Sequence, residues 1–184
     1  MRDIVLDGES LKIRDVVETG LGKTIVSLSN KAREKMENSR LGISRILQSG
    51  ETTYGVNTGF GALSSVSIDS DKLETLQVNL IRSHACGVGE EMENKHTLMM
   101  MLIRANTLCR GNSGARPLIV DTLISMINHK ICPAIPRIGS LGASGDLAPL
   151  SHLAMGMMGE GFCYIMDEGG NWNKVPALDA LKKY

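Results

Sequence analysis

The sequence predicts a mainly α-helical fold with one minor β-hairpin, and three observations support this fold class. Apolar residues recur at helical spacing in several long stretches. The 20 glycines gather in clusters that separate these stretches. Only one segment, near the end of the sequence, has the apolar runs around a turn that are typical of a hairpin. A hydrophobic content of 42% with a charged content of 22% agrees with a globular protein.

The first two expected helices have start and stop signals. Ser10 is a candidate N-cap and Gly20 a stop for a short helix over 10–20. A longer amphipathic helix over 28–49 ends at Gly50. The apolar side chains that we expect to face inward from it are Met36, Ile43, Ile46 and Leu47.

The middle of the chain predicts helices over residues 69–85, 93–109 and 118–129. Asp69 or Ser70 can cap the first of them. The second contains the almost continuous apolar run 99–103, so we expect it to be buried on most sides. Pro117 fits the first turn of the third.

Prolines and glycines organise the last part of the chain. Pro133 and Pro136 favour an extended stretch toward Gly139, where the second glycine cluster begins. The elements expected after this cluster are a helix over 150–159, hairpin strands over 162–166 and 172–175, and a helix over 177–184.

Charge and composition exclude several classes of function. The 20 basic and 20 acidic residues balance, which argues against a nucleic-acid partner. No apolar run is long enough to span a bilayer and no signal peptide opens the chain, so we expect a cytoplasmic protein with no membrane partner. The four cysteines lie too far apart in the sequence for a zinc or redox motif, so we expect reduced thiols and no metal.

The most informative segment is 139–150. Its plain interpretation is a helix start with Ser144 or Asp146 as the N-cap. That interpretation leaves the small residues on both sides of Ser144 unexplained. In a compressed turn, by contrast, the amide nitrogen of Gly145 can approach the carbonyl carbon of Ala143, because glycine adds no steric barrier.

Such a turn could make a reactive group from ordinary residues. Ring closure with loss of water, followed by loss of the Ser144 hydroxyl, would leave a methylidene conjugated to an imidazolone, which is a strong electrophile. We expect Gly142 and Asp146 to support the loop. A nearby helix N-terminus would stabilise developing negative charge.

Two further segments hold side chains that could do chemistry. Tyr54, in the glycine-rich loop 51–68, is either a surface residue packed against a neighbour or a general base on a closing lid. His84 lies near a helix end, where it is either a satisfied partner or a contact for a substrate ring. The histidines that we expect only in packing or on the surface are His96, His129 and His152.

These segments resemble the aromatic amino acid ammonia-lyases. The run Gly139–Leu150 is similar to the family signature, whose Ala-Ser-Gly forms an internal prosthetic group. The run Tyr54–Gly61 matches the loop that carries the family's catalytic tyrosine, and Ser83–Gly89 matches the segment that selects the substrate's ring. All three motifs stand in the family's order.

The resemblance implies a role for each candidate residue. Ala143, Ser144 and Gly145 would form a 4-methylidene-imidazole-5-one, with no metal or diffusible cofactor. This electrophile would bind the substrate's amine and improve its departure, while Tyr54 removes the β-proton and His84 contacts the ring. The implied binding partner is then the substrate, a small-molecule amino acid.

The segment around His84 narrows the range of candidate substrates. A histidine there is similar to the histidine and tyrosine enzymes, whereas phenylalanine-specific relatives tend to carry an apolar residue. Ser-His-Ala followed by Gly-Val-Gly most resembles the histidine enzymes. The implied reaction is elimination of ammonia from L-histidine to give trans-urocanate, the first step of histidine degradation. A tyrosine ammonia-lyase, an aminomutase with the same prosthetic group and a non-catalytic truncated fragment stay open.

The resemblance covers residues 5–178 and corresponds to the first third of a family member. It implies that 1–184 is the N-terminal region of a helical, aspartase/fumarase-like fold, with the Tyr loop over 51–68 and the Ala-Ser-Gly loop over 139–150. The C-terminal helical bundle would be absent. Family members are homotetramers whose active sites draw on three subunits, so we expect the chain alone to be inactive.

Overall fold

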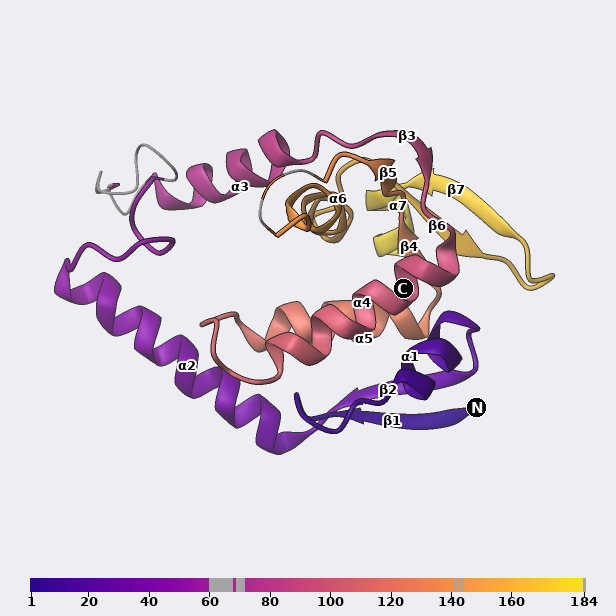
Figure 1. Ribbon diagram of the computed structural model, residues 1–184, viewed down its shortest axis with the longest axis horizontal. Coiled ribbons are helices and arrows are strands. Elements are labelled where there is room, and N and C mark those ends of the chain that lie inside the picture. The colour runs from indigo at the N-terminus through magenta and orange to yellow at the C-terminus, as the bar shows by residue number, and fades with distance from the viewer. Residues whose placement is uncertain (60–67, 69–71, 141, 143, 184) are drawn as a thin grey trace.

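Figure 1 shows a computed structural model in which helices surround and connect three small sheets. The structure describes residues 1–59, 68, 72–140, 142 and 144–183. The helices are α1 (Ile13–Gly20), α2 (Asn30–Ser49), α3 (Leu73–His84), α4 (Asn94–Leu108), α5 (Pro117–Asn128), α6 (Leu147–Met157) and α7 (Ala177–Lys182). The strands are β1 (Arg2–Leu6), β2 (Thr24–Leu28), β3 (Val88–Glu91), β4 (Ile131–Pro133), β5 (Pro136–Ile138), β6 (Phe162–Met166) and β7 (Trp172–Pro176).

The predicted fold class is confirmed. A helix occupies each stretch where one was expected, although α6 begins three residues early and α3 begins at Leu73. The two cap candidates for α3, Asp69 and Ser70, lie outside the described residues. Among the helices of the described ranges, none combines the length and apolar character needed to cross a membrane.

The predicted hairpin is also confirmed. β6 and β7 pair antiparallel from Phe162 opposite Pro176 to Met166 opposite Trp172. β4, from the extended stretch after α5, pairs with the other edge of β6 and completes a sheet of order β4-β6-β7. β5 is not part of this sheet and pairs antiparallel with β3.

The N-terminal pair β1–β2 was not predicted. The two strands are parallel, with Arg2 opposite Thr24 and Leu6 opposite Leu28, and α1 forms the crossover that a parallel pair requires. The expected N-cap was also wrong, because α1 starts at Ile13. The amide of Ser10 instead donates to the Asp7 carboxylate at 2.8 Å, within a turn that precedes the helix.

The core lies between α4, α5 and the β1–β2 pair. Apolar side chains from α4 and α5 with at most 1% exposure are Leu98, Met101, Leu102, Ala105, Val120, Leu123, Met126 and Ile127. Ile4, Leu6 and Val26 close this core from the strands. The expectation for 99–103 is correct only in part, since Ile103 is 49% exposed and α4 buries one face.

Helix α2 ends at Gly50 as predicted and begins two residues later than predicted, and its predicted inner face is buried only in part, since Ile43 and Ile46 are half-buried. Ser29 caps it through a bond from the Ala32 amide, and Gly50 ends it in the left-handed region at φ 71°. Met36 is buried, whereas Leu47 is exposed. Figure 1 shows why, because the second half of α2 leaves the core and projects to one side.

Candidate active site

The loop before α6 carries Ser144 and Gly145. Gly145 has φ +69° and Gly142 has φ +93°, a left-handed backbone that favours glycine. Space is open where a Cβ would stand on either glycine. The Ser144 side chain is exposed. Ala143 lies outside the described residues.

The start of α6 differs from the plain capping interpretation. Asp146 occupies the N-cap position, but its side chain makes no capping bond. The helix begins at Leu147, so its first backbone N–H groups face the side on which Ser144 lies. An exposed hydroxyl, a left-handed glycine and an adjacent helix N-terminus are compatible with a backbone-derived electrophile in this loop. The described residues of the loop therefore fit the expected prosthetic group.

The loop before α6 and the segment after α3 come together at two glycines. A Cβ on Gly139 would lie 2.8 Å from the Cα of Gly87, closer than real Cβ atoms approach. A Cβ on Gly87 would in turn lie 3.1 Å from the Cβ of Pro136. Only residues without side chains allow this approach, which brings the segment of His84 against the start of the Ala-Ser-Gly loop.

His84 is half-buried at the last position of α3. Its Nδ1 lies 2.8 Å from the carbonyl oxygen of Leu80 and 3.1 Å from the hydroxyl of Ser83. Because a carbonyl oxygen only accepts, Nδ1 carries the proton. Neutral His84 therefore keeps a lone pair on Nε2, and this atom can accept a hydrogen bond from a substrate's ring.

Tyr54 lies in a turn that buried polar residues organise. Asn57 is 6% exposed, and its side chain accepts from the Thr53 amide at 2.8 Å and donates to the Glu51 carbonyl at 2.9 Å. Tyr54 itself is 64% exposed. A fixed turn therefore presents the phenol at the surface. The sequence interpretation overlooked Asn57, although an asparagine among glycines is a signal for a turn.

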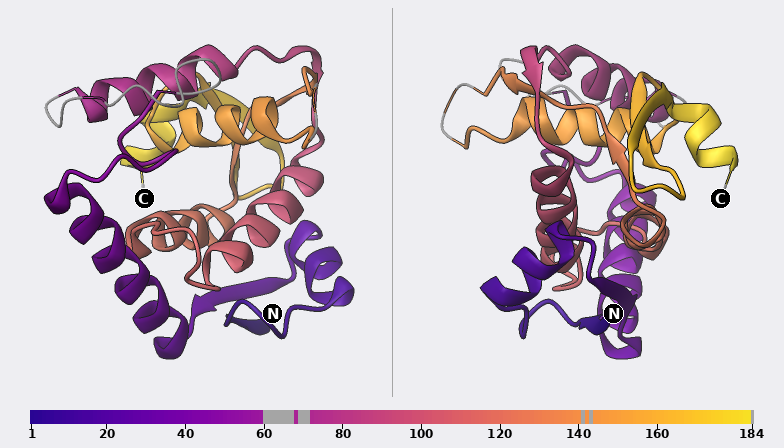
Figure 2. Two further views of the ribbon diagram at one scale, coloured as in Figure 1. Left: turned by 60° about the vertical axis from the view of Figure 1, so that its left-hand side comes forward. Right: turned by 90° about the vertical axis from the view of Figure 1, so that its right-hand side faces the viewer.

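The Tyr54 turn and the Ser144 loop lie on different sides of the chain. The turn adjoins the N-terminal end of α3, whereas His84 lies at the other end of this 12-residue helix. A helix of this length spans about 18 Å. Figure 2 shows the two loops apart in both of its views. The chain thus brings two of the three site segments together and holds the third away from them.

A cleft adjoins the Tyr54 turn, whose residues Gly55, Val56 and Asn57 line it. It measures about 690 Å³ and lies between α2, α3 and the segment before α5, with Arg40, Asn57, Gln77 and Arg116 in its walls. Tyr54, His84 and Ser144 are not among its lining residues.

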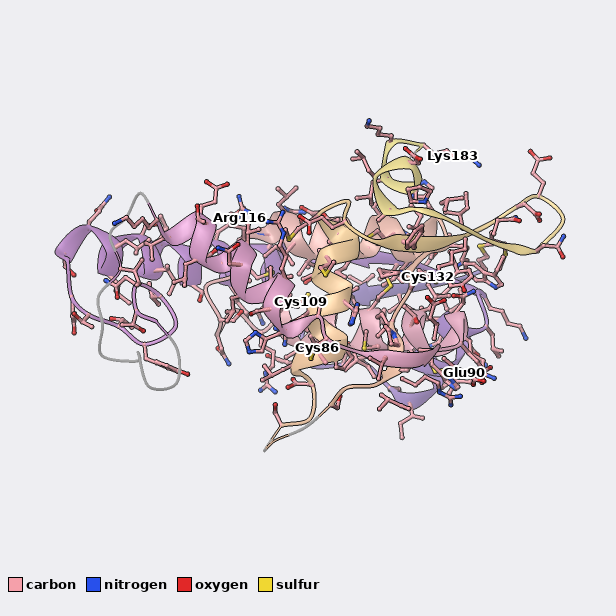
Figure 3. All side chains as sticks on the ribbon, turned by 90° about the horizontal axis from the view of Figure 1, so that it is seen from above. Cys86, Glu90, Cys109, Arg116, Cys132 and Lys183 are labelled. Carbon is pink, nitrogen blue, oxygen red and sulfur yellow. The ribbon has the colours of Figure 1, made fainter. Side chains whose placement is uncertain are left out.

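Three of the four cysteines are buried, and burial disfavours their thiolate forms. Burial raises the pKa of Cys109 and of Cys163 to about 11, and it also raises the pKa of Cys132. Figure 3 shows the exposed fourth thiol, Cys86, at the end of α3. Within the described ranges, no group of three or more His, Cys, Asp or Glu residues could hold a metal ion.

Three proteins illustrate what the chain is similar to. The histidine ammonia-lyase of Staphylococcus saprophyticus is 49% identical over 164 residues, which are 89% of this chain and 33% of that protein. The crystal structure of histidine ammonia-lyase from Trypanosoma cruzi is 37% identical with a TM-score of 0.87, over 100% of this chain and 34% of that one. The structure of a tyrosine aminomutase from Streptomyces globisporus is 34% identical with a TM-score of 0.85, over 98% and 33%.

The match to the family extends over nearly the whole chain. The chain spans about a third of the length of these relatives. A family model described as aromatic amino acid lyase matches residues 11–184, a range that holds all three site segments. The chain belongs to the aromatic amino acid lyase family.

Proposed function

We propose that the whole protein is an ammonia-lyase that eliminates ammonia from L-histidine and releases trans-urocanate, the first step of histidine degradation. The observation that carries this proposal is the contact between Gly87 and Gly139, which sets His84 and its segment against the loop of Ser144. The 49% identity to a histidine ammonia-lyase supports the same substrate.

The Ala143-Ser144-Gly145 loop is proposed to form the methylidene-imidazolone in the mature protein. When formed, this group supplies an electrophile that takes up the substrate's amine. The left-handed backbone of Gly145 favours the turn, and the exposed Ser144 hydroxyl can leave to solvent. Gly142 and Asp146 support the loop, and the first amides of α6 stabilise negative charge beside it.

Tyr54 is the proposed base for the β-proton. That proton is barely acidic, so the reaction needs a base held at a defined position. The Asn57 side chain provides such a position by fixing the turn on both sides of the phenol. Because this turn and the Ser144 loop lie on different sides of one chain, we propose that Tyr54 serves the site of a neighbouring copy.

His84 is the proposed contact for the substrate's ring. Its Nε2 lone pair can accept from the N–H of a substrate imidazole. The same atom could accept from a phenol, so tyrosine is the second candidate substrate, and the 34% identity to a tyrosine aminomutase favours keeping it. A site built around this acceptor would strongly disfavour a plain phenyl ring.

The proposal includes an assembly. We propose a cytoplasmic homotetramer in which 1–184 is the N-terminal region, and in which a C-terminal helical bundle completes each active site. The partial coverage of the relatives and the exposed second half of α2 support this arrangement. The chain by itself is then inactive, because too few groups are positioned around the substrate.

The decisive experiment offers the whole protein L-histidine or L-tyrosine and follows the absorbance of urocanate or coumarate. Intact mass is measured on the same sample, since formation of the group removes two waters, about 36 Da. We expect urocanate and the mass deficit together. Turnover of histidine by a protein whose residues 143–145 remain a linear peptide would contradict the proposed chemistry, and coumarate alone would replace histidine by tyrosine.

A further inference from the structure

His152 holds the segment of His84 against the helix that follows Ser144. It lies on α6, five residues after the helix start, and is half-buried. The amide of Gly87 donates a hydrogen bond to its Nε2 at 3.0 Å. The sequence interpretation placed His152 in packing or on the surface, because this partner is 65 residues away.

The two segments pack closely at this bond. A Cβ on Gly87 would lie 3.0 Å from Nε2, so a larger residue at this position would require the imidazole to move. Because Nε2 accepts, the proton of neutral His152 lies on Nδ1. Burial lowers the pKa of His152, which favours this neutral form.

A second contact between α3 and α6 lies on the other side of His84. The guanidinium of Arg82 binds Glu160, just beyond the end of α6, with Nη2 to Oε1 at 2.6 Å and Nε to Oε2 at 3.0 Å. Residues 82 and 87 thus bracket His84, and both are attached to the α6 region. The exposed ion pair contributes little stability, whereas the bond to His152 is partly buried.

We propose that His152 is a positioning residue, which acts through Gly87 to fix His84 relative to the Ser144 loop. The Ser144 loop and His152 are both connected to α6, since this helix begins three residues after Ser144 and carries His152 in its middle. A shift of α6 would then carry the loop and the ring contact together, and their spacing would be kept. This inference rests on the proposed function, because it assigns His84 to the substrate's ring.

The variants are chosen to separate the hydrogen bond from the volume of the ring. His152→Gln keeps an acceptor near the place of Nε2, and His152→Leu removes it at similar size. His152→Asn is too short to reach Gly87 and serves if the leucine variant fails to fold. His96→Leu, at an exposed histidine on α4, is the matched control.

The first measurement does not depend on activity. Hydrogen exchange of the peptide that contains Gly87, followed by mass spectrometry in the whole protein, reports the bond directly. We expect exchange to rise several-fold in His152→Leu and to stay near the original rate in His152→Gln and His96→Leu. Unchanged exchange in His152→Leu would show that the bond does not hold this segment, and would overturn the proposal.

The second measurement tests action through His84. We expect His152→Leu to raise the KM for L-histidine by roughly 5–10-fold, the effect of one lost neutral hydrogen bond, with a smaller change in kcat. His152→Gln should restore most of the loss. In a His84→Leu background, His152→Leu should add nothing, because its target is gone.

The outcomes separate the two proposals. If the unchanged protein does not turn over L-histidine, the proposed function fails, and the exchange experiment still decides whether His152 holds Gly87. If the unchanged protein does turn it over while His152→Leu has the original KM, the positioning role fails alone. Additive losses in the double variant would also contradict it, since His152 would then act independently of His84.

Discussion

Two pairs of elements in this chain are built in opposite ways. The pair α4–α5 contributes eight apolar side chains to the buried core that are at most 1% exposed. Helix α3 is similar in length to α5 and has apolar residues at helical spacing, but none of its residues is buried. The α3 region is attached to the α6 region by polar contacts, from Arg82 to Glu160 just beyond α6 and from Gly87, after α3, to His152.

The difference separates the parts that hold the fold from the parts that present chemistry. The inner faces of the buried pair are covered by other elements of this chain. Helix α3 links the Tyr54 turn at one end to His84 at the other, and the apolar side of this link is half-open. In the proposed assembly, further segments cover that side, so substitutions in the two regions should have opposite effects on stability and turnover.

The largest expected effect is on turnover alone. Tyr54→Phe in the whole protein should lower kcat for L-histidine by about 10²–10⁴-fold, because a proposed base is lost while its fixed turn remains. The unfolding midpoint in urea should stay within experimental error. The matched control is Tyr164→Phe, whose hydroxyl donates to Glu91 at 2.5 Å away from the site, and which should lower stability with little loss of turnover.

The reverse effect is expected in the core. Leu102 is fully buried, so Leu102→Ala should lower the free energy of unfolding by about 2–5 kcal/mol. Leu76→Ala on half-open α3 should cost less than about 1 kcal/mol in the 184-residue chain. Urea denaturation of both variants measures the difference. Equal losses in this chain would remove the distinction between the two regions, and a larger loss for Leu76→Ala in the whole protein would show that α3 is covered there.

The same contrast explains what the sequence could predict. The helices and the β6–β7 hairpin depend on periodicity and turn signals within a few residues, and these predictions are confirmed. The β1–β2 pair joins two five-residue strands across a helix, a pairing that no local pattern specifies. Ser10 failed as a cap because α1 begins only at Ile13, where the Asp15 carboxylate accepts from the amide of Lys12.

In the candidate site, too, local features could be predicted from the sequence and long-range contacts could not. Tyr54, His84, Ser144 and Gly145 could be proposed from motifs, because each motif is a short continuous run. The arrangement that joins them could not, since Gly87 meets Gly139 and His152 only after α3 and α6 have packed. A lone histidine in a helix carries no sequence signal for a backbone partner 65 residues away.

A smaller effect is expected where β3 meets the hairpin. Glu91 accepts from the Tyr164 hydroxyl at 2.5 Å and from Lys174 Nζ at 2.6 Å. Burial opposes ionisation of Glu91, but these two bonds outweigh it and lower its pKa. Glu91→Gln should therefore cost about 1–2 kcal/mol near neutral pH. A lowered folded-state pKa stabilises the protein above the unfolded-state value of about 4.3, so the loss should shrink as the pH falls below that value and through the folded-state pKa. A loss that stays equal from pH 7 down to pH 2 would show that charge is not involved.

The smallest expected effect belongs to the turn before α1. The Asp7 carboxylate accepts from the amides of Ser10 and Glu9, both at 2.8 Å, and these bonds lower its pKa from 3.8 to about 2. A lowered folded-state pKa stabilises the protein above the unfolded-state value, so this contribution is complete above about pH 4 and disappears as the pH falls toward 2. Asp7→Asn should flatten the stability curve in that interval by about 1 kcal/mol or less, since the turn is at the surface.

Urea midpoints at half-unit steps from pH 5 to 2 measure this flattening, with Asp3→Asn on β1 as control. The same slope in Asp7→Asn and the unchanged protein would assign the acid sensitivity to other carboxylates, and turnover by the whole protein should not respond to Asp7→Asn, because this turn belongs to the side of the chain that holds the fold.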